Sequence, residues 1–116
     1  MKLREAIDRA DRIRPNAVHQ DDKRLALYKL ECDVAEMMGE ELPEWDPDDD
    51  CDLLMPDPHS EIYPAHLCAY IDWAQEETDL YQIDMFMANQ TMAEAKAFWR
   101  RNVRQDEDIK IKGVFV

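Results

Sequence analysis

Apolar residues recur at helical spacing in four segments of this chain. Residues 3–13 and about 22–38 each carry one apolar stripe opposite a charged face, which is typical of helices that cover the core of a small domain. A third segment begins near Ser60, and a fourth runs from about Asp79 to Arg104. The pattern therefore predicts a mainly α fold, a compact four-helix domain whose two long helices lie at the C-terminal end.

Residues at the ends of these segments indicate where the helices begin and stop. Asp21 or Asp22 can cap the second helix, and Gly39 can end it in the left-handed conformation. Ser60 is a suitable N-cap for the third helix. Pro64 then falls in the first turn of that helix, where its missing N–H costs no helical hydrogen bond.

Two short segments predict a minor β element. Leu53–Met55 is apolar and is closed by Pro56 and Pro58, and the tail 109–116 alternates apolar and polar residues like a strand. A single strand is unstable alone. We therefore expect the tail to pair with Leu53–Met55 or with a neighbouring protein.

The segment 40–52 predicts an acidic loop, with Trp45 as the side chain that anchors it. Its alternating aspartates resemble the ligands of a calcium loop. However, Cys51 occupies the position of the glycine that such a loop needs for its sharp turn, and the bidentate Glu at the end is missing. We interpret the segment as a solvated loop rather than a calcium site.

Composition limits the class of protein. The 116 residues fit one domain, 1–116, and 46% hydrophobic residues argue for a folded core despite a net charge of −13. Only two glycines occur, which disfavours a Gly-rich phosphate loop. No run approaches the ~18 apolar residues of a membrane span, and Met1 to Glu5 lack a signal-peptide pattern, so we expect a cytosolic protein.

Charge is distributed in blocks along the chain. Between Leu30 and Ala95 there is no Lys or Arg, whereas 19 of the 27 acidic residues lie there. Both flanking segments, 1–29 and 96–116, carry more basic than acidic residues. Such a layout suits basic ends that dock on an acidic middle, in the same subunit or the next. It does not suit a protein that holds DNA through clustered Lys and Arg.

We find no catalytic constellation in the sequence. His66 and Cys68 lie two residues apart on a helix and cannot face one metal ion, and no Cys-x-x-Cys pair occurs. The three cysteines are odd in number, which favours reduced thiols. We therefore expect that the protein is not an enzyme and that it binds no cofactor and no metal.

The two C-terminal helices are more apolar than one small core requires. On the third helix, one apolar stripe consists of Tyr63, Leu67, Tyr70, Ile71 and Ala74. A second stripe, on another side of the helix, consists of Ile62, His66, Ala69 and Trp73. We predict that the second stripe, one side of the fourth helix and its basic end form an oligomer interface. The predicted interface residues are Ile62, His66, Ala69, Trp73, Phe86, Lys96, Arg100, Arg101 and Arg104. Two alternatives remain: Trp73 covers a part of its own subunit, and the basic end is solvated.

Several short motifs in residues 53–102 follow an unusual order. They are Leu53-Leu54-Met55-Pro56-Asp57-Pro58, Glu61-Ile62-Tyr63, Ile71-Asp72-Trp73 and Phe98-Trp99-Arg100-Arg101-Asn102. This order resembles a family of head–tail connector proteins, also called adaptor or neck proteins, of tailed phages and prophages. The chain departs from that family at Gln75-Glu76, where relatives often carry Asn-Gly, and at His59, where they carry a second aromatic residue.

The resemblance implies a structural protein of the virion. It implies a subunit that forms a homo-oligomeric ring, dodecameric when assembled, beneath the portal protein. The ring would bridge the capsid to the tail-completion or stopper protein, with DNA passing through it and no specific nucleic-acid contact. It also implies assembly in the host cytoplasm and a final place in the virion neck.

Two other functions fit parts of the sequence. An acidic DNA mimic, or another small helical inhibitor, would use the negative charge to occupy the DNA site of a nuclease or repressor, and binding to a basic partner would favour it. A small metal-dependent enzyme or calcium protein would respond in a metal-binding assay.

Overall fold

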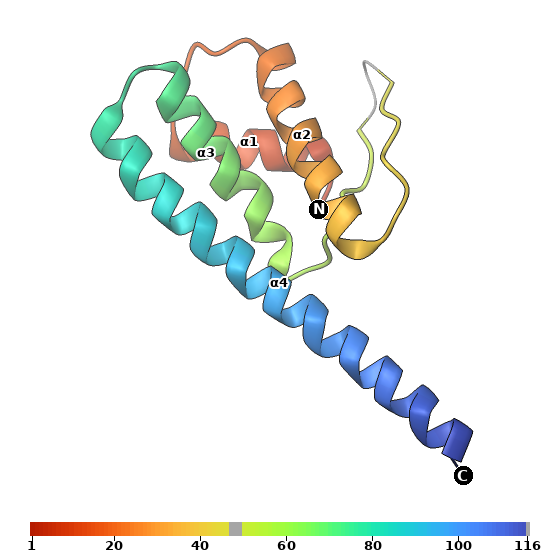
Figure 1. Ribbon diagram of the computed structural model, residues 1–116. Coiled ribbons are helices and arrows are strands. Elements are labelled where there is room, and N and C mark those ends of the chain that lie inside the picture. The colour runs from red at the N-terminus through yellow and green to blue at the C-terminus, as the bar shows by residue number, and fades with distance from the viewer. Residues whose placement is uncertain (47–49, 116) are drawn as a thin grey trace.

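The computed structural model describes the backbone of residues 1–46 and 50–115 and the side chains of residues 1–46 and 50–102. Within these residues the chain forms four α-helices and one 3₁₀ turn, so the predicted mainly α fold is confirmed (Figure 1). The elements are α1 (Leu3–Ile13), α2 (Gln20–Met38), η1 (His59–Glu61), α3 (Ile62–Ala74) and α4 (Thr78–Phe115).

The helix α3 lies at the centre of the fold. It packs against α1, α2 and α4, and α4 returns beside it as the second arm of a helical hairpin before extending past the rest of the molecule (Figure 1). Each helix contributes small or branched apolar residues to one core. The fully buried members include Leu3, Ala6, Ala10, Leu27, Val34, Ile62, Tyr63, Leu67, Ile71, Ala88 and Ala95.

The observed helix ends confirm two sequence predictions and correct two others. Gly39 ends α2 with a φ of 72°, and Pro64 lies in the first turn of α3. The predicted aspartate cap is wrong, because α2 begins earlier and His19 Nδ1 accepts the hydrogen bond of the Asp21 N–H at 3.2 Å. Ser60 is not the cap of α3 either. It lies in η1, and its buried hydroxyl bonds the Asp57 carboxylate.

The predicted β element is wrong in the described residues. The tail continues α4 to Phe115, because each residue added to an existing helix gains a backbone hydrogen bond, whereas a lone strand gains none. Val116 lies outside the described residues. The segment around Leu53 forms only an isolated antiparallel bridge, Lys2 to Asp52, with the N-terminus. In it the Leu53 N–H donates to the Met1 carbonyl at 2.9 Å.

The segment between α2 and α3 is held in place by two buried polar side chains. The Tyr63 hydroxyl donates to Glu31 Oε1 at 2.7 Å and accepts from the Met55 N–H at 2.8 Å. Glu31 Oε2 accepts from the Leu54 N–H at 3.0 Å. Burial raises the pKa of Glu31, while these hydrogen bonds oppose the rise. The network gives the backbone of a buried, non-helical segment the partners that a sheet would otherwise supply.

The acidic loop is attached to α2 through Trp45, as predicted. The ring of Trp45 meets that of Tyr28 edge to face, with centroids 5.2 Å apart, and the Arg24 guanidinium lies 5.5 Å from its centroid. The Tyr28 hydroxyl donates to the Pro43 carbonyl at 2.9 Å. Residues 47–49 of this loop, which include Asp48, lie outside the described part of the chain.

Replacing Tyr63 with Phe should destabilise the protein by about 1–3 kcal/mol, because both Glu31 Oε1 and the Met55 N–H lose a buried partner. Urea denaturation of the wild type and the variant measures this loss. Tyr70→Phe is the matched control, since Tyr70 is only half-buried. Equal stability losses in the two variants would contradict a special role for the Glu31–Tyr63 network.

Candidate functional site

A partly buried cluster of charged side chains joins α1, α3 and α4. Arg14, at the C-terminal end of α1, donates from Nε to Asp84 Oδ2 at 2.9 Å and from NH2 to Asp84 Oδ1 at 3.1 Å. The same Nε lies 3.5 Å from Asp72 Oδ1 on α3. A bidentate pair of this kind fixes the direction of both side chains. The cluster therefore sets where α1 ends relative to the α3–α4 hairpin.

Asp72 is the unusual member of this cluster. Its side chain is fully buried, and neither carboxylate oxygen accepts a hydrogen bond from a described donor. Burial raises the pKa of Asp72 to about 7, the neighbouring Asp84 carboxylate adds to the rise, and Arg14 opposes it. Burial likewise raises the pKa of the Cys68 thiol to about 11. The carboxyl group of Asp72 thus lies between α1, α3 and α4 without a described hydrogen-bond donor, and Asp72 also contributes to the lining of a pocket of about 560 Å³ beside Trp73 and Tyr81.

A second polar contact joins α1 to α2. Lys23 is only 2% exposed, and its Nζ lies 2.9 Å from Asp11 Oδ1 and 3.2 Å from Asn16 Oδ1. A buried ammonium group needs such partners, because burying an unpaired charge is costly. This pair fixes the turn between the first two helices.

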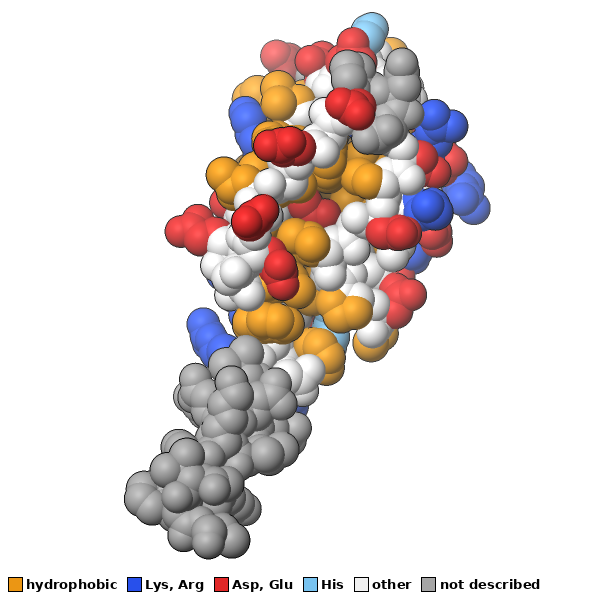
Figure 2. Space-filling view, turned by 90° about the vertical axis from the view of Figure 1, so that its right-hand side faces the viewer, with side chains coloured by type: hydrophobic (Ala, Val, Ile, Leu, Met, Phe, Trp, Pro, Cys, Tyr) orange, Lys and Arg blue, Asp and Glu red, His pale blue; other side chains and the backbone are white. Residues whose placement is uncertain are grey.

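A cleft on the described surface lies between α2 and α4. It has a volume of about 570 Å³, and its floor is mainly apolar. Hydrophobic side chains gather where α4 leaves the body (Figure 2). The cleft is lined by Leu30, Asp33, Val34, Glu36, Met37, His66, Met92, Lys96, Trp99 and Arg100.

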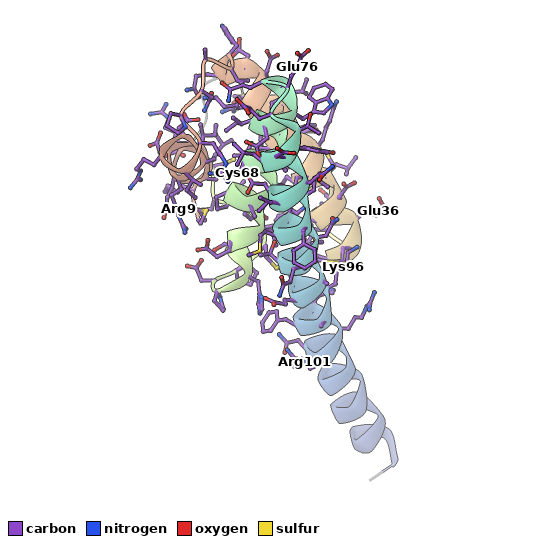
Figure 3. All side chains as sticks on the ribbon, turned by 90° about the vertical axis from the view of Figure 1, so that its left-hand side faces the viewer. Arg9, Glu36, Cys68, Glu76, Lys96 and Arg101 are labelled. Atoms are coloured by element: carbon purple, nitrogen blue, oxygen red, sulfur yellow. The ribbon has the colours of Figure 1, made fainter. Side chains whose placement is uncertain are left out.

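The two walls of this cleft carry opposite charges. Asp33 and Glu36 belong to α2, whereas Lys96 and Arg100 belong to α4, and Figure 3 labels Glu36 and Lys96 on their two helices. No ion pair joins these groups among the side chains that the structure describes. The charge layout predicts that the basic end docks on the acidic middle of the chain. Within the subunit, Lys96 and Arg100 share one cleft with Asp33 and Glu36, and docking on the next subunit stays a prediction. The Arg104 side chain lies outside the described residues.

His66 lies in the same cleft. Its Nδ1 is 2.7 Å from the Ile62 carbonyl, one turn earlier in α3. Burial lowers the pKa of His66, so the neutral ring is favoured. His66 therefore contributes a mostly apolar surface to the cleft rather than a charge.

The structure corrects part of the predicted interface on α3. Ile62 and Ala69 are 0% and 2% exposed, so they belong to the core of their own subunit and cannot be interface residues. They are buried because α3 is covered on several sides by the other helices. Trp73, by contrast, is 64% exposed, and its ring lies 6.1 Å from that of Tyr70. An interface role for Trp73 stays a prediction.

The exposed side of α4 carries the other large apolar residues. Phe86 is 68% exposed, Ile83 58% and Met87 48%. Phe86 is one of the predicted interface residues, whereas the exposure of Ile83 and Met87 was not predicted from the sequence. At 3.6 residues per turn, Phe86 lies about half a turn from the buried Ala88 and Ala95, Ile83 about a third of a turn and Met87 about a quarter of a turn.

The described residues offer no metal centre and no membrane span. No group of three or more His, Cys, Asp and Glu side chains among them is arranged to hold a metal ion. No helix of the described chain combines the length and the apolar character needed to cross a membrane. What remains as candidate functional surface is the α2–α4 cleft, Trp73 and the exposed side of α4.

Comparison with protein-family models, with curated proteins and with solved structures gives no match.

Replacing Asp72 with Asn should raise stability at pH 8 and have a smaller effect at pH 5. The folded-state pKa of about 7 lies above the usual value of 3.8, so the folded protein binds more protons than the unfolded chain between these values. Wild-type stability therefore falls as pH rises through this window, and Asn removes that contribution. Denaturation at both pH values measures it.

The exposed Asp8, in the middle of α1, supplies the matched control, Asp8→Asn. This variant should follow the wild type at both pH values. A stability difference between Asp72→Asn and the wild type that does not change with pH would contradict the protonation of Asp72 in the folded state.

Proposed function

We propose that this chain is a structural subunit of the neck of a tailed phage or prophage. In this role it forms a homo-oligomeric ring at the portal protein and joins the capsid to the tail. The order of motifs between residues 53 and 102 supports the proposal through the resemblance described above. A role of this kind rests on surfaces rather than on an active site.

The observation that carries the proposal is the exposure of Trp73 and Phe86. Each leaves about two thirds of its side chain uncovered in the isolated subunit. Contiguous exposed patches of large apolar side chains mark sites of protein contact, and the exposed Ile83 and Met87 adjoin Phe86 on α4. They lie on the two helices of the same hairpin, so the chain has more apolar surface than its own core can cover.

Charge supports the same role. The basic end of α4, with Lys96, Arg100 and Arg101 exposed, can meet the acidic middle segment of a neighbouring subunit. Exposed pairs contribute only about 0–1 kcal/mol each, but several together set the orientation of neighbours and make assembly sensitive to salt. The surplus of acidic residues also suits a ring through which DNA passes without binding.

The test is deletion of the gene from the phage or prophage that carries it. Lysates should then contain DNA-filled heads and separate tails, and the wild-type gene supplied in trans should restore complete particles. Electron microscopy of the lysates measures both outcomes. Complete, infectious particles without this protein would refute the proposed function.

Trp73→Ala should leave the fold intact and weaken assembly onto the portal. An exposed substitution changes stability by no more than about 0.5 kcal/mol, because the folded subunit loses few contacts. Thermal unfolding and binding to portal-containing heads measure the two effects. Trp45→Ala is the control that should destabilise the subunit, since Trp45 packs on Tyr28. A large loss of stability in Trp73→Ala would show that Trp73 belongs to the core.

A further inference from the structure

The exposed side of α4 carries a regular seam of residues that its own subunit leaves uncovered. Ile83, Phe86, Gln90, Ala93 and Ala97 follow steps of three and four residues, which places them in one line on a helix. All five are exposed. The line lies a third to a half of a turn around the helix from the buried Ala88 and Ala95, so this line, here called the outer seam, faces away from the body. Figure 1 shows the body along one side of α4. A line with this spacing is typical of two packed helices.

The side chains of the outer seam become smaller along α4. The first two members of the seam, Ile83 and Phe86, are large, whereas its last two, Ala93 and Ala97, are small, and Gln90 lies between them. Close packing between helices places large side chains opposite small ones. Two copies that run antiparallel with Gln90 at the centre approach this condition. Ile83 and Ala97 are each seven residues from Gln90 and face each other, while Phe86 falls next to the partner's Ala93. Parallel copies would place Phe86 against Phe86 and leave gaps at the alanines.

The charges around the outer seam favour the same direction. Asp79 lies eleven residues before Gln90 and Arg101 lies eleven residues after it, and both are exposed. Figure 3 labels Glu76 and Arg101 near opposite ends of the part of α4 that lies along the body. At a rise of 1.5 Å per residue, Asp79 and Arg101 are about 33 Å apart in one chain, so they cannot pair within it. In an antiparallel pair each Asp79 faces the partner's Arg101.

We propose that the outer seam is a two-fold interface with a second copy of this chain. The two α4 helices pack antiparallel about an axis at Gln90, and the two Gln90 amides hydrogen-bond each other across the axis. Such an interface is isologous, since each copy presents the same patch to the other. Like charges would meet in the parallel arrangement, so the charges at the two ends select the antiparallel one.

This inference goes beyond the proposed function. A ring is built from head-to-tail contacts, whereas a two-fold contact closes on itself as a dimer. Both contacts use Phe86, so the dimer and the ring are alternative states of one subunit. The dimer is then the form of the free protein, and its test needs no phage particle.

The first experiment measures the oligomeric state of the full chain by sedimentation equilibrium. The wild type should be a dimer, and Phe86→Glu should be a monomer with unchanged helical circular dichroism. Leu25→Glu is the matched control, because Leu25 is 52% exposed on α2, away from the seam, and this variant should stay dimeric. A monomeric wild type, an assembly larger than a dimer, or equal behaviour of the two variants would overturn the proposal.

The second experiment determines the direction of the helices by disulfide cross-linking. It uses chains in which Cys32 and Cys51 are replaced by Ser, which leaves only the buried Cys68. A mixture of Ile83→Cys and Ala97→Cys chains should form a mixed disulfide on oxidation, whereas Ile83→Cys alone should not cross-link. Efficient cross-linking of Ile83→Cys with itself would show parallel helices and would refute the antiparallel interface.

Discussion

The fold depends on how the chain between α2 and α3 is buried without a sheet. Leu53 and Met55 enter the core, so the backbone around them loses contact with water. Glu31 and Tyr63 supply hydrogen-bond partners from two different helices, and the Met1 carbonyl accepts from the Leu53 N–H. Because one network holds both helices and the segment between them, it determines how α2 lies against α3. The motif around Leu53 thus packs in the core and is held there by hydrogen bonds to Glu31 and Tyr63.

Two further polar contacts fix the positions of other helices in a similar way. Lys23 joins α1 to α2, and Arg14 joins α1 to the α3–α4 hairpin through Asp72 and Asp84. Removing Asp11 or Asp84 is more costly than the contact itself is stabilising, because the remaining cation, Lys23 or Arg14, loses its hydrogen-bonded partner. The core of this small domain is rich in alanine, and these directional contacts give its helices one arrangement. The arrangement is what places Trp73 and the outer side of α4 in solvent.

The exposed surfaces separate into two kinds with different physical character. The cleft between α2 and α4 is concave, with an apolar floor and walls of opposite charge. The outer seam of α4 is convex and mainly apolar, with acidic and basic residues at its two ends. A subunit with both kinds can make more than one contact with its neighbours. This property supports an assembly role more directly than any single residue does.

The sequence alone determined the features that depend on neighbouring residues. The apolar periodicity located the four helices, Gly39 marked the end of α2, and Pro64 marked the first turn of α3, because these effects act within one helical turn. The pairing of Glu31 with Tyr63, and of Arg14 with Asp72 and Asp84, joins residues far apart in the chain, so only the tertiary structure decided it. The same holds for Ile62 and Ala69. A helix with two apolar sides does not reveal which side its neighbours cover, and the packing of α3 among three helices placed both residues in the core and left Trp73 outside.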